Sequence, residues 1–191
     1  LARVEIPAPA GSAGMPGVIV PRKAVSEVLK LIEDAESDVT IELSANKIRF
    51  NFGAVVLTSK LIDGTFPDYA RVIPTGNDKR LVVERDEFRK AVDRVSTISS
   101  ERGRAVKMAL GDGKLTLSVT NPDAGAANEE LEVDYDSTAL DIGFNAKYLL
   151  DIANQLDSDT ALFRLADAGS PTIIQDRDGA AALYVLMPMR V

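Results

Sequence analysis

Three segments of the chain carry apolar residues at the spacing i, i+3, i+4 and i+7, which gives an α-helix one apolar stripe. The three sets are Val25, Val28, Leu29 and Ile32; Phe88, Ala91, Val92 and Val95; and Leu149, Ile152, Ala153 and Leu156. Phe88 lies 63 residues after Val25, and Leu149 lies 61 residues after Phe88. This nearly constant interval predicts that one helical unit is repeated three times along the chain.

Each predicted helix lies between segments that have the pattern of β-strands. A short apolar segment precedes each helix, at residues 17–20, 80–83 and 139–144. The segments after the helices are short apolar runs or alternate apolar with polar residues, as half-buried strands do. They are residues 39–43 and 48–52 in the first unit, 115–119 and 131–135 in the second, and 161–165, 172–174 and 182–187 in the third. The unit is therefore predicted to be a strand, a helix and three strands, which makes the fold class α+β with antiparallel sheets.

The number of repeats predicts how the chain is divided. A helix with one apolar stripe on one sheet needs a second such layer to close its core, so two units per domain are expected. Three units then correspond to one and a half domains. Residues 74–79 (PTGNDK) are rich in turn formers and are the expected linker. The prediction is a partial domain at 1–74, cut at its N-terminal side, followed by a complete domain at 75–191.

Composition excludes several kinds of chemistry. The chain contains no histidine and no cysteine, so zinc sites and the Ser-His-Asp and Cys-His types of catalytic site are not expected. It has 46% hydrophobic residues, enough for a core, without an apolar run approaching the roughly 18 residues of a membrane span. The first residues show no signal-peptide pattern, and a cytoplasmic location is expected. A net charge of −7 argues against a nucleic-acid partner unless basic residues gather on one surface.

Four motifs occur in an order that resembles one protein family. They are residues 58–69 (TSKLIDGTFPDY) with 71–74 (RVIP), the terminus 184–191 (YVLMPMRV), 18–23 (VIVPRK) and 142–145 (IGFN). Together they resemble the bacterial DNA sliding clamp, the beta subunit of DNA polymerase III, over essentially the whole chain. The first and the last motif are the most specific.

The resemblance implies a DNA-clamp fold and a function without catalysis. In the family, two protomers of three similar domains close head to tail into a homodimeric ring, with helices lining the hole and sheets outside. Such a ring encircles double-stranded DNA without reading its sequence and acts as a processivity factor. The implied partners are replicative and translesion polymerases, the clamp loader and mismatch-repair proteins, which bind through short linear motifs. No cofactor and no metal are implied, and the implied location is the cytoplasm, in association with the nucleoid.

The resemblance also implies a hydrophobic pocket for peptides between the second and third domains. Its lining, carried over by position, is Leu1, Pro67, Arg71, Val72, Asn145, Tyr148, Pro171, Val185, Leu186, Met187, Pro188, Met189 and Arg190. Periodicity alone favours another interpretation, in which residues 185–186 belong to a core strand and residues 187–189 are a frayed tail. The chain departs from the family near Gly103, where members can carry a bulkier residue, so the family pattern does not define that wall of the pocket.

Two further surfaces are implied by the resemblance. The residues expected to face DNA are Arg22, Lys23, Lys30, Arg85, Arg89, Lys90, Arg94 and Lys147, all on the predicted helices. Acidic residues share these helices, so an ordinary solvated helix face would look similar. Thr97 and Ile98 are expected at the edge where the third domain meets the first domain of the other protomer.

Two rival functions remain open on the residues themselves. One is a small hydrolase that uses carboxylates or a Ser-Lys pair, for which no recognisable arrangement is present. The other is an acidic peptide-binding module that never contacts DNA. Residues 176–179 (DRDG) and 111–114 (GDGK) lack the spacing of a calcium loop and of a phosphate-binding loop, and both are predicted to be turns.

Overall fold

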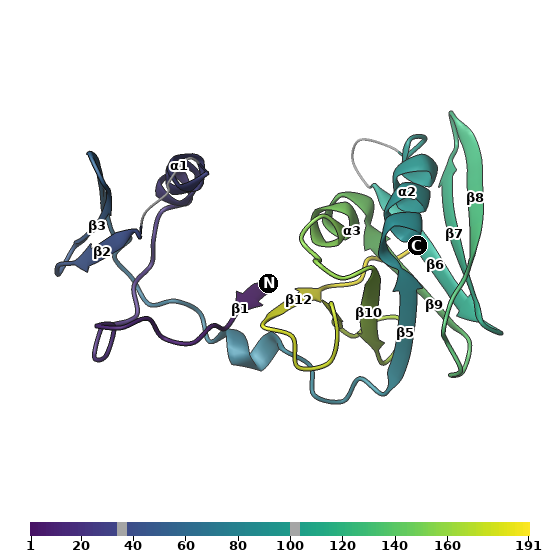
Figure 1. Ribbon diagram of the computed structural model, residues 1–191. Helices are drawn as coiled ribbons and strands as arrows, with labels where there is room; N and C mark the ends of the chain where they lie inside the picture. The colour runs from purple at the N-terminus through teal and green to yellow at the C-terminus, as the bar shows by residue number, and fades with distance from the viewer. Residues whose placement is uncertain (34–37, 100–103) are drawn as a thin grey trace. The chain divides into compact units, whose positions relative to one another are not determined.

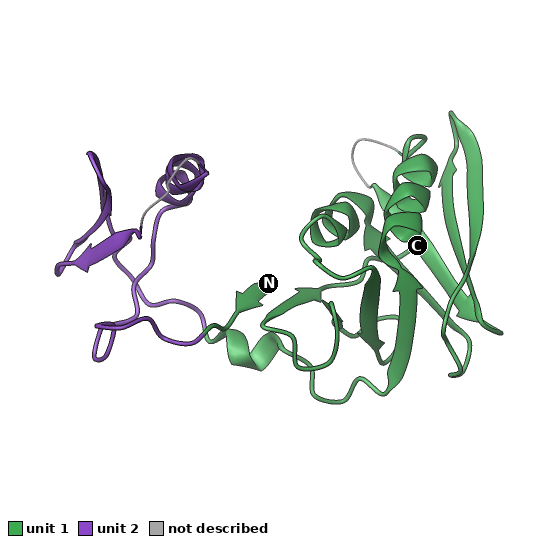
Figure 2. Ribbon diagram, viewed as in Figure 1, with its two compact units in different colours: residues 1–6, 68–191 green, residues 7–67 purple. Residues whose placement is uncertain are grey.

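The computed structural model describes residues 1–33, 38–99 and 104–191. The chain forms two compact units, drawn in different colours in Figure 2. The larger unit consists of Leu1–Ile6 with Asp68–Val191, and the smaller unit is Pro7–Pro67. Both contain helices packed with antiparallel sheets, so the predicted α+β class is confirmed.

The larger unit has two antiparallel sheets and two α-helices (Figure 1). The five-stranded sheet has the order β1 (Ala2–Val4), β12 (Ala182–Leu186), β11 (Thr172–Gln175), β10 (Thr160–Leu165), β5 (Lys79–Glu84). The four-stranded sheet has the order β8 (Gly125–Glu132), β7 (Lys114–Asn121), β6 (Ala105–Gly111), β9 (Leu140–Asn145). Helices α2 (Arg85–Ser96) and α3 (Ala146–Ala153) pack against each other, and a 3₁₀ turn, η1, covers Tyr69–Val72.

The two repeats of the larger unit exchange their leading strands. Strand β5 begins the second repeat, but it pairs along its whole length with β10 of the third repeat, with Phe163 opposite Leu81. In the same way β9, which begins the third repeat, pairs with β6 of the second repeat, with Val106 opposite Phe144. One repeat alone therefore leaves both sheets incomplete, and this is the physical reason that two repeats form one unit.

The helical stripes of the second and third repeats enter one shared core. Phe88, Ala91, Val92 and Val95 of α2 are all buried, as are Leu149 and Ala153 of α3 and Leu156 just beyond it. The ring of Phe88 meets that of Phe163 edge to face, with 5.3 Å between the ring centroids. Residues of both helices and of both sheets belong to a single buried cluster. The periodicity of these two segments thus predicted correctly which faces are buried.

The smaller unit contains a single repeat. Helix α1 (Arg22–Ile32) is followed by the sheet β2 (Thr40–Leu43), β3 (Lys47–Phe52), β4 (Val55–Lys60). Only Ala24 of α1 is buried, whereas Val25 and Leu29 of the predicted stripe are exposed. A single repeat has no partner layer to cover this face, in line with the two-layer argument made from the sequence.

The predicted strand at residues 17–20 is wrong. These residues form no β-ladder in the described part of the chain, although the carbonyl of Ile19 accepts a hydrogen bond from the amide of Ile62 at 2.9 Å. In the larger unit each leading strand pairs with a strand of the other repeat, and the smaller unit contains no second repeat to supply one. The predicted segment 131–135 is displaced as well, because β8 ends at Glu132 and only Asp134 bridges onward, to Val82.

The two predicted turns are confirmed. Asp112 and Gly113 both have positive φ, 50° and 73°, which is the backbone of a two-residue hairpin turn between β6 and β7. Residues 176–179 form the first part of the connection from β11 to β12, which covers residues 176–181, and Gly179 there has a φ of 73°.

Candidate functional site

An apolar cleft of about 550 Å³ opens on the surface of the larger unit. Its lining comes from three elements, β1, α3 with the residues just after it, and β12 with the first residue of the tail. The residues are Leu1, Ala2, Tyr148, Asp151, Ile152, Gln155, Tyr184, Val185, Leu186 and Met187. Five of them, Leu1, Tyr148, Val185, Leu186 and Met187, belong to the pocket predicted from the sequence.

The wall from α3 follows from a second stripe on that helix. Tyr148, Asp151, Ile152 and Gln155 repeat the spacing i, i+3, i+4 and i+7, one position before the stripe that enters the core. Tyr148 is exposed, and Ile152 lies at the border of the two stripes, half-buried against the core. The helix therefore anchors one face in the core and presents the neighbouring face to the cleft.

The opposite wall is held by strand pairing. The amide of Val185 donates to the carbonyl of Leu1 at 2.8 Å, and the backbone nitrogen of Leu1 donates to the carbonyl of Val185 at 3.0 Å. Ala2 lies opposite Tyr184 in the β1–β12 ladder. Residues from the start and the end of the chain thus form one edge, an arrangement that no local pattern in the sequence reveals.

The lining of the cleft carries one charged side chain, Asp151, which has no ion pair among the described residues. Burial raises the pKa of the Tyr184 hydroxyl, and the carboxylates of Asp176 and Asp157 raise it further, so that this group stays neutral at physiological pH. The cleft therefore presents mainly apolar surface, and the polar side-chain groups of its lining are one carboxylate, the amide of Gln155 and the hydroxyls of Tyr148 and Tyr184. Such a surface suits an apolar ligand better than a reaction that needs a general base. The sequence prediction did not include Ala2, Asp151, Ile152, Gln155 and Tyr184. The second helical stripe could have indicated the three that lie on α3 or just after it.

The other predicted pocket residues are not part of the lining of this cleft. Asn145 caps α3, because its side chain accepts a hydrogen bond from the amide of Lys147 at 2.9 Å. The carbonyl of Pro171 accepts from the side chain of Asn77 at 2.9 Å. Arg71 and Val72 belong to η1 and do not line the cleft, and Arg71 pairs with Asp68 at 2.9 Å. Pro67 belongs to the smaller unit.

The last three predicted pocket residues, Pro188, Met189 and Arg190, follow Met187 in the C-terminal tail. Pro188 and Met189 are half-buried and Arg190 is exposed. They are not part of the lining of the cleft. Gly103 lies outside the described residues.

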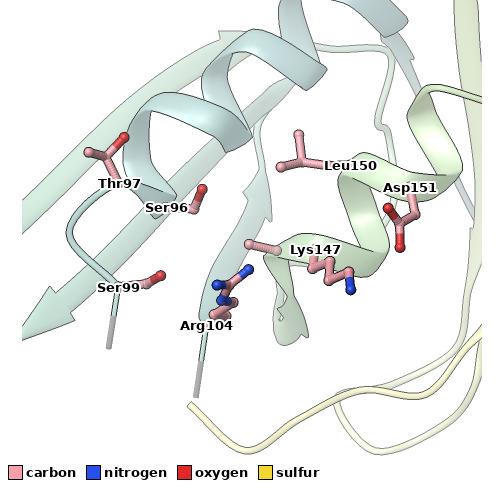
Figure 3. A pocket seen from close by; sticks show the side chains of 8 residues that line it. Ser96, Thr97, Ser99, Arg104, Lys147, Leu150 and Asp151 are labelled. Atoms are coloured by element: carbon pink, nitrogen blue, oxygen red, sulfur yellow. The ribbon is translucent and has the colours of Figure 1, made fainter. Parts of the chain in front are cut away.

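A second, more polar cavity of about 420 Å³ lies where the end of α2 meets the start of α3 (Figure 3). It is lined by Ser96, Thr97, Ser99, Arg104, Ala146, Lys147, Leu150 and Asp151. Thr97, one of the two predicted dimer-edge residues, is exposed there. The other, Ile98, packs against the core, and its carbonyl accepts from the side chain of Asn121 at 2.7 Å.

The predicted DNA-facing cations differ in whether they already contact other groups of the protein. Arg85 donates to the carbonyl of Leu156 at 2.7 Å, and Arg94 contacts Glu129 at 2.6 Å. The hydrogen bond to Glu129 raises the pKa of Arg94. Weaker contacts join Lys30 to Glu27 at 3.2 Å and Arg89 to Asp86 at 3.8 Å. Arg22, Lys23, Lys90 and Lys147 make no ion pair among the described residues.

Residues 1–33, 38–99 and 104–191 contain no cluster of three or more potential metal ligands. None of the helices in these ranges is long and apolar enough to cross a membrane.

Comparison with known proteins identifies the family. The family model described as the DNA polymerase III beta subunit, C-terminal domain, matches residues 70–190, and the central-domain model of the same subunit matches residues 1–68. The architecture is that of a DNA clamp. The chain belongs to the DNA polymerase III beta subunit family, the bacterial sliding clamps of DNA replication, as the motifs in the sequence indicated.

Relatives and solved structures agree with this assignment. The beta sliding clamp of Caulobacter vibrioides (strain NA1000 / CB15N) is 54% identical over 191 residues, which is 100% of this chain and 51% of that protein. The beta sliding clamp of Escherichia coli K12 is 37% identical over 174 residues, 91% of this chain and 48% of that protein. The crystal structure of a DnaN sliding clamp from Bartonella birtlesii bound to griselimycin has a TM-score of 0.95 at 59% identity, covering 100% of this chain and 51% of that one. The predicted clamp fold is thus confirmed, and the chain spans about half the length of the curated relatives it matches.

Proposed function

We propose that the chain is part of a DNA polymerase processivity factor, a ring that encircles duplex DNA and holds other proteins on it through the apolar cleft. Family membership supports the role in replication. The observation that carries the proposal is the cleft, which offers apolar surface from β12, α3 and the tail. The partners are polymerases, the clamp loader and repair proteins, each contributing a short linear motif.

The chemistry of the cleft defines the kind of ligand. Tyr148 and Met187 are exposed. Apolar side chains of a bound peptide would cover them, so that apolar surface of the cleft and of the peptide would leave water together. Methionine is flexible and polarizable, which lets one surface accommodate several related peptides. Tethering by such a peptide raises the effective concentration of a polymerase at the template.

The test is titration of a fluorescent peptide of the Gln-Leu-x-Leu-Phe kind against the 191-residue chain. Three variants accompany it: Met187→Ala, a chain lacking residues 187–191, and the control Val56→Ala. Met187 is 60% exposed and Val56 58%, so both substitutions shorten an apolar side chain of similar fractional exposure, but only Met187 lines the cleft. Truncating an interface anchor costs roughly 1–2 kcal/mol, which corresponds to about 5- to 30-fold in Kd.

The expected result is saturable binding that Val56→Ala leaves unchanged, Met187→Ala weakens and the deletion abolishes. Equal binding by all four proteins would place the peptide site outside the cleft. Absence of binding by the unaltered chain, while the relatives bind the same peptide, would refute the proposal for this chain.

DNA contact in this proposal is loose and independent of sequence. Cations that face phosphates supply a salt-dependent attraction, and topological linkage replaces tight binding. Lys90 and Lys147, which have no ion pair among the described residues, are the best placed on the larger unit to supply it. With a net charge of −7 on the whole chain, the attraction depends on such local groups.

We assign no catalytic step to the chain. It contains no imidazole or thiol, and the cleft described above has a single carboxylate. Turnover of a generic ester or phosphoester substrate that disappeared on substitution of one aspartate or serine would favour the hydrolase instead.

A further inference from the structure

Gly143 lies where the C-terminal tail crosses the edge of a sheet. It is a buried residue in β9, the edge strand of the four-stranded sheet, and it pairs with Lys107 of β6 on its inner side. On its outer side it forms an isolated antiparallel bridge with Met189. The amide of Met189 donates to the carbonyl of Gly143 at 2.7 Å. The tail is therefore attached to β9 at this one position.

Space, rather than backbone conformation, requires a glycine here. Gly143 is not among the residues with positive φ, so any amino acid could adopt its backbone. A Cβ atom added to it would lie 2.7 Å from the carbonyl oxygen of Met189 and 2.8 Å from Cγ2 of Val191, and closer still to Cγ1 of Val191. Cβ atoms essentially never make non-bonded contacts shorter than 3.0 Å, so the tail would have to shift. Glycine weakens a strand interior, and its presence there commonly marks the close approach of another backbone.

The attachment of the tail restrains the backbone of Met187, a residue of the cleft lining. Leu186 is held in β12 opposite Thr172, and Met189 is held against Gly143. Only Met187 and Pro188 lie between these two fixed points, and the ring of Pro188 restricts its own φ. Met187, which lines the cleft with 60% of its surface exposed, therefore has a restrained backbone, and this sets the point from which its flexible side chain enters the cleft.

We propose that Gly143 is a positioning residue for the cleft: by accepting the tail against β9 it holds Met187 in the place where a peptide binds. This inference rests on the proposed function, because it concerns the same cleft. Gly143 itself is not part of the lining. It acts through the tail.

The experiment compares Gly143→Ala with two variants chosen from the same contacts. Gly111→Ala is the matched control, because Gly111 also lies in the four-stranded sheet but its added Cβ would meet only Cβ of Ala139 at 3.6 Å, an ordinary contact. Gly143→Ala/Val191→Ala removes the methyl groups that the new Cβ would strike. If the introduced methyl group acts through the tail, the double variant regains part of the lost binding, whereas general weakening of β9 would not be reversed.

Two readouts keep the inference separate from the proposed function. The first is the Kd of the fluorescent peptide. The second is the methyl NMR spectrum without peptide, in which the four methionines of the chain, at positions 15, 108, 187 and 189, are assigned by substitution. A chain ending at Pro188 removes the attachment while keeping Met187, and it replaces Gly143→Ala if that variant does not fold.

Gly143→Ala is expected to shift the methyl signals of Met187 and Met189 and to weaken peptide binding about tenfold, as loss of one interface anchor does, while Gly111→Ala changes neither. Unmoved methyl signals with unchanged peptide binding would overturn the inference and leave the proposed function intact. Moved methyl signals in a chain that binds no peptide would overturn the proposed function and keep the positioning role of Gly143.

Discussion

Replacing Phe163 by alanine tests whether strand exchange makes the larger unit one cooperative structure. The side chain is 1% exposed, faces Leu81 across the β10–β5 ladder and meets the ring of Phe88 edge to face at 5.3 Å. It therefore joins the sheet of one repeat to the helix of the other. Removal of a buried phenylalanine ring costs about 3–5 kcal/mol, and the edge-to-face pair accounts for about 0.5–1.5 kcal/mol of it.

The assay is urea unfolding followed by tyrosine fluorescence. The chain has no tryptophan, and its four tyrosines, at positions 69, 135, 148 and 184, all lie in the larger unit, so the signal reports on that unit alone. Phe163→Ala is expected to lower the free energy of unfolding by about 3–5 kcal/mol without changing the slope, since the same surface is exposed on unfolding. Phe163→Leu, which keeps most of the apolar volume, should cost much less.

Two results would refute this reasoning. A loss below about 1 kcal/mol would mean that the ring does not join the halves of a packed core. A tyrosine signal with two separate transitions would mean that the repeats unfold independently, contrary to the exchange of β5 and β9. A double-mutant cycle with Phe88→Ala isolates the pair itself, with an expected coupling of about 0.5–1.5 kcal/mol.

Three further predictions concern charge and assembly. Lys90→Ala and Lys147→Ala should each weaken the binding of duplex DNA at low salt more than Arg94→Ala does, because Arg94 is already paired with Glu129 at 2.6 Å. Fluorescence anisotropy measures the binding, and an equal loss of affinity in all three variants would contradict this. The amide of Gly169 and the hydroxyl and amide of Ser170 donate hydrogen bonds that hold the pKa of the Asp167 carboxyl below its usual range. The carboxylate therefore contributes to stability above the unfolded pKa of about 4, and this contribution is lost as the pH falls through the folded pKa. Asp167→Ala should therefore lower the urea midpoint at pH 7 and lower it less at pH 3, whereas an equal loss at both pH values would exclude this carboxylate as the cause. The 191-residue chain by itself should neither close a ring nor support processive synthesis, since it spans about half the length of the curated relatives it matches. Closed dimers in sedimentation would overturn this.

Sequence periodicity determined the local features of this protein. The stripes that begin at Phe88 and Leu149 predicted two helices and the faces they bury, because the spacing of apolar residues decides which face of a helix can be buried once a second layer covers it. The interval of 61–63 residues predicted the repeat, and the motifs at 58–69 and 184–191 predicted the family. Turn residues such as Asp112 and Gly113 marked a hairpin, because the positive φ values it requires are a property of one or two residues.

Tertiary structure decided which repeats share a sheet. The pairing of β5 with β10 and of β9 with β6 joins residues about 80 and 35 positions apart, and nothing in a strand's own pattern identifies its partner. For the same reason residues 17–20 have the pattern of a strand but no ladder in the described part of the chain. Their repeat has no second repeat with which to exchange within the smaller unit.

The cleft shows the same division between local and long-range causes. Periodicity could indicate that α3 has a second face, but only the fold brings that face next to Leu1 and Met187, from opposite ends of the chain. Gly143 is the clearest case, because a glycine in a strand pattern gives no sign of what approaches it. Its requirement comes from Met189 and Val191, more than 40 residues further along, since the space beside a backbone is set by packing and not by the residue itself.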